Sequence, residues 1–425
     1  MAHVSRTHRR GAAYLVALLA GSIVTVTGLT ALSIATSRAR GTAMSDDAAR
    51  ARLMADSGLE HALSAIAAQL RAGETRGDLI DEDWPVITFD RGQFTWALTE
   101  FDGSPLSGDG LPMRVRVVSR SGQARHAIGA ALVPSGVPYD SLDTGMYAGG
   151  TMNLTALSSL SSDKVVGSIG AVSALTATIT APVESADSVG GTLYLGTTSS
   201  NVAPRRMPSP VLIDDYIKMG QTIAFADLPA ITGGRALRNI LLSPGNNPFG
   251  PTNALGVYVI DLSGSRLLVE DIRIHGTLVL LNPGPNTVIG NNVLIEPAFP
   301  WMPSLIVQGN VTFMGTNTGP NEATIGVNLN PPHTPFEGAY NSTTTDAYPG
   351  RVGGLIYVSG NATFALPRQN IRGTLLVGGD VNVNASVVVN ITYDPKIAHL
   401  PPLGFFQDAG GLALDPASIV WQLPD

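Results

Sequence analysis

The stretch GAAYLVALLAGSIVTVTGLTALSIATS (Gly11–Ser37) carries no charged residue over 27 positions. A helix rises about 1.5 Å per residue, so this stretch is long enough to cross a hydrocarbon core of about 30 Å. The apolar core of a cleaved secretory signal is shorter, at about 7–15 residues. We therefore predict a membrane-anchoring helix, with an unusually long signal peptide as the alternative.

Basic residues on both sides of this stretch predict its orientation. Arg6, Arg9 and Arg10 precede it together with the terminal amine, whereas Arg38 and Arg40 follow it. The excess of positive charge before the helix places the N-terminus in the cytoplasm. We expect a single-pass protein of the cell inner membrane whose C-terminal bulk is periplasmic or extracellular.

The composition of the remaining chain favours β structure. Only 14% of the 425 residues are charged, 47 are glycine and none is cysteine. Chains rich in Gly, Val, Thr and Asn form strands joined by tight turns. The absence of cysteine excludes disulfides, thiol nucleophiles and thiolate metal sites. The net charge of −7, with no basic cluster outside the membrane flanks, predicts no binding of nucleic acid.

The helical pattern continues beyond the apolar stretch. Apolar residues such as Leu59, Ala62 and Ile66 keep one face of a helix apolar, and no proline occurs before Asp83. We predict one helix over residues 12–72, with its first half in lipid and its second half along a soluble domain. Residues 86–134 then read as a small antiparallel module, because segments such as Met113–Ser119 alternate apolar and polar side chains.

The sequence HRRGAAYLVALLAGSIVTVTGLTAL, which begins at His8, resembles the leader junction of type IV pilus and type II secretion pilins. Arg9 and Arg10 end a basic leader over residues 1–11, and the apolar helix begins directly after Gly11. The resemblance implies that a membrane prepilin peptidase cuts between Gly11 and Ala12 and methylates the new amine.

Two further features indicate which kind of pilin the chain resembles. The segment ARARLMADSGLEHALSAIA (Ala49–Ala67) is similar to minor pilins of the PilX kind and to GspK-like minor pseudopilins. Major pilins carry a glutamate at the fifth mature position, where this chain has Val16. The resemblance therefore implies a minor pilin or pseudopilin whose helix packs against other subunits.

From Tyr139 onward a short unit recurs, in which an apolar strand, a glycine and another short strand follow one another. The copies are Met146–Leu154, Ile272–Leu280, Leu305–Phe313, Ile356–Phe364 and Leu375–Val383, with a weaker one at Val288–Ile295. Gly290 and Gly309 are 19 residues apart, as are Gly360 and Gly379. This spacing is typical of stacked coils whose apolar side chains form one core.

We therefore predict a mainly β protein with a long N-terminal α-helix, in which a pilin-like module precedes a right-handed parallel β-helix-like solenoid. The solenoid would occupy residues 139–400, interrupted by a linker at 200–232 that packs outside it. Asparagines at the bends would hydrogen-bond along the stack. The tail 401–425 would cap the open end of the solenoid. A β-sandwich, which also needs many short strands, is the alternative.

No sequence motif predicts a catalytic, metal or cofactor site. The seven histidines lack zinc-site spacing, and HExxH, P-loop and GxSxG motifs are absent. The densest charged stretch of the solenoid combines His275 with Glu270, Asp271 and Arg273. A polysaccharide-cleaving groove would need two tuned carboxylates about 5–10 Å apart. We favour the simpler interpretation, a solvated strand.

The sequence thus predicts a non-enzymatic envelope protein, anchored by its N-terminal helix, that displays a solenoid for filament assembly or adhesion. Its expected partners are the inner membrane, other pilin subunits, a prepilin peptidase and a surface polysaccharide. Two alternatives stay open. One is a membrane-anchored β-helix enzyme or binding protein that acts on polysaccharide, and the other is a surface structural protein with an uncleaved anchor.

Overall fold

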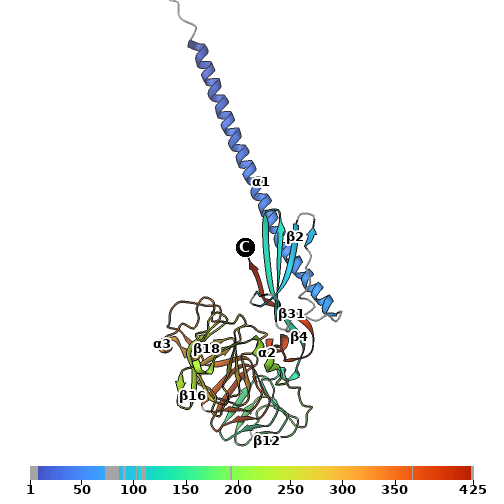
Figure 1. Ribbon diagram of the computed structural model, residues 1–425, viewed down its shortest axis with the longest axis vertical. Coiled ribbons are helices and arrows are strands. Elements are labelled where there is room, and N and C mark those ends of the chain that lie inside the picture. The colour runs from blue at the N-terminus through green and yellow to red at the C-terminus, as the bar shows by residue number, and fades with distance from the viewer. Residues whose placement is uncertain are drawn as a thin grey trace, which may run out of the picture.

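The computed structural model describes residues 8–71, 86–89, 92–101, 103–104, 106, 112–191, 194–365 and 367–422. A long helix stands away from the rest of the chain, and its second half lies along a small sheet (Figure 1). The solenoid lies beyond the far end of that sheet. The predicted fold class, mainly β with one long N-terminal helix and a parallel solenoid, is confirmed.

Helix α1 (His8–Arg71) is one unbroken element of 64 residues, as predicted. Its second half buries one face, formed by Ala55, Leu59, Ala62 and Ile66, against the small sheet. Its first half stands clear, and Leu32 there is 61% exposed. Within the described residues, a search for a helix sufficiently long and apolar to traverse a bilayer finds none.

The small sheet is antiparallel, with the strand order β1–β2–β3–β4–β31. Its strands are β1 (Ile87–Phe89), β2 (Gly92–Glu100), β3 (Met113–Ser121), β4 (Ala124–Pro138) and β31 (Phe406–Gln422). Alternate side chains such as Trp96, Val115 and Val117 face α1 and are buried beneath it. The predicted strands of this module are therefore present.

The prediction that the tail caps the solenoid is wrong. Strand β31 pairs antiparallel with β4, from Phe406 opposite Pro138 to Gln422 opposite Ala127. Leu412 and Leu414 of the tail pack against the helix-facing core of the small sheet. The tail pairs here because β4 would otherwise leave an edge of unpaired backbone groups. The solenoid is thus an insertion between two neighbouring strands of the small sheet.

Parallel strands of the solenoid stack into three faces. The first face comprises β14 (Gln221–Thr222), β17 (Val257–Asp261), β19 (Thr277–Leu281), β22 (Leu305–Gln308), the second halves of β26 (Arg351–Val358) and β28 (Arg368–Val377), β5 (Met146–Ala148), β8 (Val166–Ser168), β11 (Val183–Ser185) and β13 (Thr198–Ser199). The second face comprises the first halves of β16 (Gly234–Leu242) and β18 (Arg266–His275), β20 (Val288–Ile289), β23 (Val311–Phe313), β27 (Ala362–Phe364), β29 (Val381–Val383), β6 (Met152–Leu154), β9 (Val172–Ala174) and β12 (Val189–Gly191).

The third face comprises the second halves of β16 and β18, β21 (Val293–Glu296), the first halves of β26 and β28, β30 (Val388–Thr392), β7 (Ser159–Ser162) and β10 (Thr178–Thr180). Outside the three faces lie β15 (Ala230–Ile231), β24 (Thr318–Asn321), β25 (Ala347–Pro349), α2 (Leu212–Met219), α3 (Glu322–Ile325), α4 (Lys396–His399) and the 3-10 turns η2 (Asp140–Asp143) and η3 (Phe225–Asp227).

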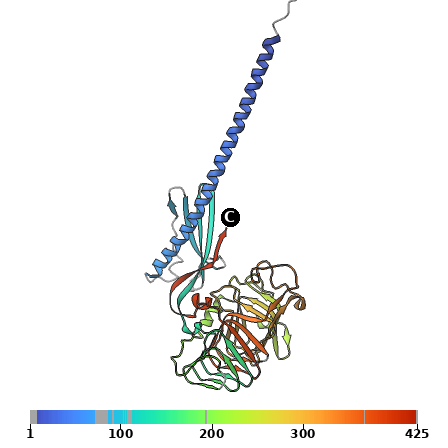
Figure 2. The same ribbon diagram turned by 180° about the vertical axis from the view of Figure 1, so that it is seen from behind.

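The order of the coils in space differs from their order in the sequence. Strand β5 pairs with β8 on one side and with β28, more than 200 residues later, on the other. The chain therefore enters in the middle of the stack and winds outward to β13. The segment 200–220, which includes α2, then connects to β14 at the opposite end, and the chain winds back until β30 meets β7. Figure 2 shows the late coils beside the early ones.

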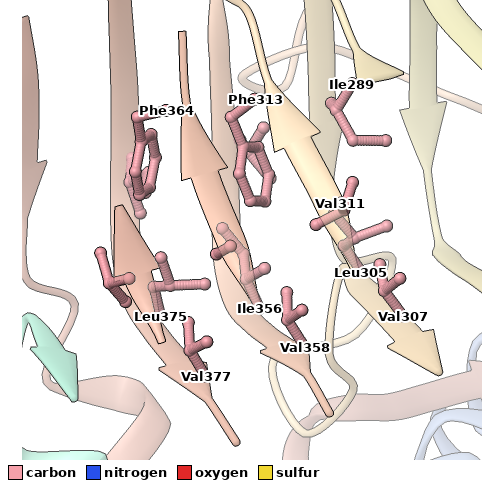
Figure 3. Packing of buried hydrophobic residues seen from close by; sticks show 14 of the residues in the cluster. Ile289, Leu305, Val307, Val311, Phe313, Ile356, Val358, Phe364, Leu375 and Val377 are labelled. Atoms are coloured by element: carbon pink, nitrogen blue, oxygen red, sulfur yellow. The ribbon is translucent and has the colours of Figure 1, made fainter. Parts of the chain in front are cut away.

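Aligned apolar side chains fill the interior of the solenoid (Figure 3). Phe313 and Phe364 stack with ring centroids 5.2 Å apart. Leu305, Ile356 and Leu375 occupy matching positions in three successive coils. A single coil cannot bury such residues, so the core exists only because the coils are stacked.

The predicted glycine repeats meet at the corner between the first and second faces. Backbone hydrogen bonds connect Gly309, Gly360, Gly379, Gly150 and Gly170 in that order along the stack. The neighbouring positions form a second ladder, in which side-chain oxygens accept hydrogen bonds from backbone amides of the next coil. These bonds run from Asn361 N to Asn310 Oδ1 (2.8 Å), from Asp380 N to Asn361 Oδ1 (2.8 Å) and from Thr151 N to Asp380 Oδ1 (2.7 Å).

The repeat at Ile272–Leu280 occupies a different corner, although its sequence resembles the other copies. Its Gly276 stacks on Gly256, where β18 of the third face turns into β19 of the first. Each corner is tight enough to require a residue without a side chain. Sequence similarity between the copies therefore reflects a shared corner geometry and not one shared position in the coil.

The stacked corner makes a specific stability prediction for Gly149. A Cβ atom at this position would lie 2.3 Å from the carbonyl oxygen of Gly378, which is backbone and cannot move aside. We expect Gly149→Ala to lower the free energy of unfolding by about 1–3 kcal/mol, as other overpacked positions do. Urea unfolding followed by circular dichroism measures this change.

The matched control for that variant is Gly190→Ala on strand β12. A Cβ atom there meets no atom within 4 Å, so the substitution should leave the urea midpoint nearly unchanged. Equal midpoints for Gly149→Ala and Gly190→Ala would show that the corner is not as closely packed as the structure indicates.

Candidate functional site

The first face of the solenoid is occupied by other parts of the chain. Its outward side chains include Val279, Ile306 and Tyr357, which pack in one buried cluster with Ile213 and Tyr216 of α2. The Tyr216 hydroxyl donates to the carbonyl oxygen of Leu403 (2.9 Å), and burial raises its pKa well above the usual range. This face holds the solenoid together with its surroundings and is not open to a partner.

The second face presents a row of small polar side chains. Thr312, Thr363, Asn382, Asn153 and Ser173 lie directly beside one another on five neighbouring strands. Each is half-buried, because its neighbours in the row cover its sides. Parallel strands are about 4.8 Å apart, so the row is a regular array of hydroxyl and amide groups.

The third face presents a similar but shorter row of Asn370, Asn390, Ser161 and Thr180. Asn390 Nδ2 donates to Asn370 Oδ1 (3.1 Å), and Ser161 Oγ donates to Asn390 Oδ1 (2.9 Å). These bonds orient the amides along the stack. Neither row contains a charged or aromatic residue.

The outer face of the small sheet carries a feature that the sequence analysis missed. Arg114, Arg116 and Arg120 alternate along β3 on the side opposite α1, and Arg125 of β4 lies directly across from Arg120. The prediction that no basic cluster exists outside the membrane flanks is therefore wrong. Only the pairing of β3 with β4 brings Arg125 to the others, although the alternation within β3 was visible in the sequence.

The charged stretch around His275 is not the solvated strand that we predicted. Arg273 is only 1% exposed, because the excursion between β24 and β25 folds over it. Its guanidinium donates to the carbonyl oxygens of Thr334 (2.9 Å) and Pro335 (2.8 Å). Burial lowers the pKa of Arg273. This arginine secures the excursion to the third face.

The other members of this stretch also have separate surroundings. Glu270 pairs with Arg238 (3.4 Å), and Asp271 accepts a hydrogen bond from Asn292 Nδ2 (2.7 Å). Both lie at the start of the third face, whereas His275 lies at its end, beside Gly276. The structure therefore does not gather the four predicted residues into one groove.

His275 instead lines a cavity of about 280 Å³ at the edge between the third and first faces. Glu296, Gly353 and Arg372 continue from His275 along the coils, and the segment from Asp394 to Ile397 lies over them. The sequence analysis did not bring these residues together. Some are about one coil apart, as His275 is from Glu296, but a 57-residue gap separates Glu296 from Gly353.

The electrostatics of the cavity are set by one ion pair and one neutral ring. Arg351 donates from Nη2 (2.6 Å) and Nε (3.0 Å) to Glu296 Oε1, which neutralises this carboxylate. Burial, with a smaller effect of the Arg273 cation, lowers the pKa of His275 to about 4. His275 is therefore uncharged at neutral pH. The described residues contain no group of acids and histidines arranged to hold a metal ion.

The predicted leader site lies apart from all these features. Arg9, Arg10, Gly11, Ala12 and Val16 belong to the first turns of α1. Their side chains are outside the described part of the structure. Their assignment to a processing site accordingly stays a prediction.

Comparison with known proteins gives only distant similarities. No family model and no curated protein matches the sequence. The competence-associated pilin ComZ from Thermus thermophilus is 11% identical, with a TM-score of 0.28, covering 89% of this chain and 98% of that chain. The DUF3494 domain of Shewanella frigidimarina ice-binding protein 1 is 14% identical, with a TM-score of 0.25, covering 61% of this chain and 98% of that chain.

The burial of His275 predicts a pH-dependent stability. As the pH falls, the unfolded chain takes up the proton near its ordinary pKa of about 6.5, whereas the folded chain does so only near pH 4. The free energy of unfolding should therefore decrease by about 3 kcal/mol as the pH falls from 6.5 to 4. Urea unfolding at several pH values measures this decrease.

The variant His275→Gln separates this effect from carboxylate titration, because glutamine keeps a polar group and cannot be protonated here. We expect it to lose stability less steeply below pH 6.5 than the unchanged protein. His399→Gln, at an exposed position, serves as the control and should retain the full slope. An unchanged slope in His275→Gln would contradict the assignment.

Proposed function

We propose that this chain is a minor pilin-like subunit that is anchored by α1 and displays the solenoid at its other end. The observation that carries the proposal is the uncovered first half of α1. Val24 is 69% exposed, Leu29 is 62% exposed and Ile34 is 50% exposed. Apolar side chains at these positions point in several directions around the helix, so one neighbouring surface could not cover them all.

Two environments would cover such a helix in turn. Before assembly the uncharged stretch Gly11–Ser37 would lie in the inner membrane, with the N-terminus in the cytoplasm. After cleavage between Gly11 and Ala12 by a prepilin peptidase, the same side chains would pack against helices of other subunits. The second half of α1 is already covered by its own sheet, which supports a role for that half within the subunit.

The shape of the chain supports a low-copy position in a filament. The solenoid is wide, and it lies at the opposite end of the small sheet from the free half of α1 (Figure 2). Neighbouring copies in a regular shaft would bring such bodies into collision. A subunit of this shape is better placed at or near the tip, where it would act in assembly or adhesion and not in catalysis.

Mass spectrometry of the mature N-terminus tests the proposal. Expression in a host with a prepilin peptidase should yield a chain that begins with methylated Ala12. Gly11→Leu should leave the leader attached, because the bulky side chain replaces the glycine before the cut. Gly28→Leu, in the same helix at a position with no atom near its Cβ, is the matched control and should be processed normally.

An intact Met1 in the unchanged protein would instead support a surface structural protein with an uncleaved anchor. A cut far from Gly11 would support a secretory signal. Because the chain has no cysteine, a single Leu175→Cys variant can report the location of the solenoid, where Leu175 is 70% exposed. Labelling by a membrane-impermeant maleimide in intact spheroplasts is expected. Labelling only after lysis would contradict the orientation.

The polar row of the second face favours a second candidate function, adsorption to an ordered lattice such as ice. A rigid parallel sheet keeps Thr312, Thr363, Asn382, Asn153 and Ser173 at a constant spacing. A periodic row of hydroxyl and amide groups suits a periodic partner, because each group can meet an equivalent site. The absence of charged side chains from the row reduces the cost of removing water from it.

Inhibition of ice recrystallisation by the full chain in lipid nanodiscs tests this second function. Thr363→Tyr should abolish the inhibition, since a large side chain at the centre of the row breaks its flatness. Thr180→Tyr makes the same change on the third face and should retain the inhibition. A chain no more active than empty nanodiscs would exclude the function.

A further inference from the structure

The cavity beside His275 has a floor that is open because of one residue. Strand β26 contributes Gly353, whereas the adjoining coils contribute the long side chains of Glu296 and Arg372 at neighbouring positions. The lack of a side chain at Gly353 leaves space between them. Pro297, Pro300 and Ile397 add apolar wall to this space.

The charges around the cavity do not balance. Glu296 is already paired with Arg351. Arg372 and Lys396 also line the cavity, and among the described residues no acidic side chain forms an ion pair with either of them. Asp394 is the remaining carboxylate, and its Oδ1 accepts a hydrogen bond from the backbone amide of Lys396 (3.1 Å). Two cations thus face one carboxylate, which favours an anionic ligand.

The third feature is a polar atom without a partner. His275 Nδ1 is buried and makes no hydrogen bond to the described residues. A buried polar atom that stays unpaired is costly, so a ligand that supplies the missing partner gains affinity. The neutral ring can exchange one hydrogen bond with a hydroxyl group, either as donor or as acceptor.

From these three features we propose that the cavity binds a single hexuronate unit of an acidic polysaccharide. The carboxylate would meet Arg372 and Lys396, where charge-assisted hydrogen bonds are stronger than neutral ones. A ring hydroxyl would pair with His275 Nδ1, and the C–H groups of the sugar would pack against the proline wall. A volume of about 280 Å³ is at the small end for ligand sites, which suits one sugar unit.

This inference goes beyond the proposed filament role and does not depend on it. It concerns recognition only, because a hexuronate held by one neutral imidazole and a paired glutamate has no second free carboxylate for hydrolysis of the kind that glycosidases perform. Binding would give a displayed solenoid a chemical preference for acidic surface polysaccharides over neutral ones.

Calorimetric titration of the full chain in nanodiscs with methyl glucuronide and methyl glucoside tests the inference. The two sugars differ only in the carboxylate. We expect the glucuronide to bind at least tenfold more tightly than the glucoside. Arg372→Gln should weaken glucuronide binding at least tenfold and leave the weak binding of the glucoside unchanged.

A second variant fills the floor and leaves every charge in place. A Cβ atom at position 353 would lie 3.4 Å from Glu296 Cγ and 3.5 Å from the carbonyl oxygen of Ile295, which are ordinary contacts. Gly353→Ala should therefore fold normally and weaken glucuronide binding. Gly190→Ala, far from the cavity, is the control and should bind as the unchanged protein does.

Equal binding of the two sugars, or no binding of either, would overturn the proposal. So would full affinity in both Arg372→Gln and Gly353→Ala. The thermal unfolding midpoint of each variant, measured in the same nanodiscs, shows whether a loss of binding accompanies a loss of fold. If Gly353→Ala is unfolded, the decision rests on Arg372→Gln alone, because this side chain is exposed and its exchange does not disturb the core.

Discussion

The stacking of parallel coils in exact register is the constraint on which the rest of this structure depends. Each coil exposes apolar residues inward that only the next coil can cover, as the aligned phenylalanines Phe313 and Phe364 show. Register is maintained at the corners, where glycine backbones hydrogen-bond from coil to coil and Asn310 and Asn361 accept amides of the following coil. A shift of one residue would turn every inward side chain outward.

The same stacking decides how the solenoid is attached to the helix. Because the chain enters in the middle of the stack and leaves from the adjoining coil, its entry and exit lie close together. Strands β4 and β31 can then pair with each other in the small sheet. Trp301 of the solenoid donates from Nε1 to the buried carboxylate of Asp415 in β31 (2.9 Å), which adds a link between the two parts. The solenoid is thus held at both of its ends.

Stacking also creates the candidate sites. The polar row of the second face is a row only because Asn153, Asn382 and Thr363 occupy equivalent positions in neighbouring coils. The cavity arises in the same way, from His275, Glu296, Gly353 and Arg372. The sequence analysis named His275 but associated it with residues beside it in the sequence. Neighbours along a strand point to opposite faces, whereas the neighbours that share a site come from other coils.

The sequence by itself determined the long helix, the alternating strands of the small sheet and the glycine corners of a parallel solenoid. These features depend on local periodicity and on backbone conformations that only certain residues adopt. It did not determine that β5 lies beside β28, that β31 joins the small sheet, or that Arg273 is buried beneath the excursion. Only the tertiary structure decided these, because strand pairing is set by which edges and faces remain uncovered once the local elements have formed, and many pairings of similar short strands satisfy the same local pattern.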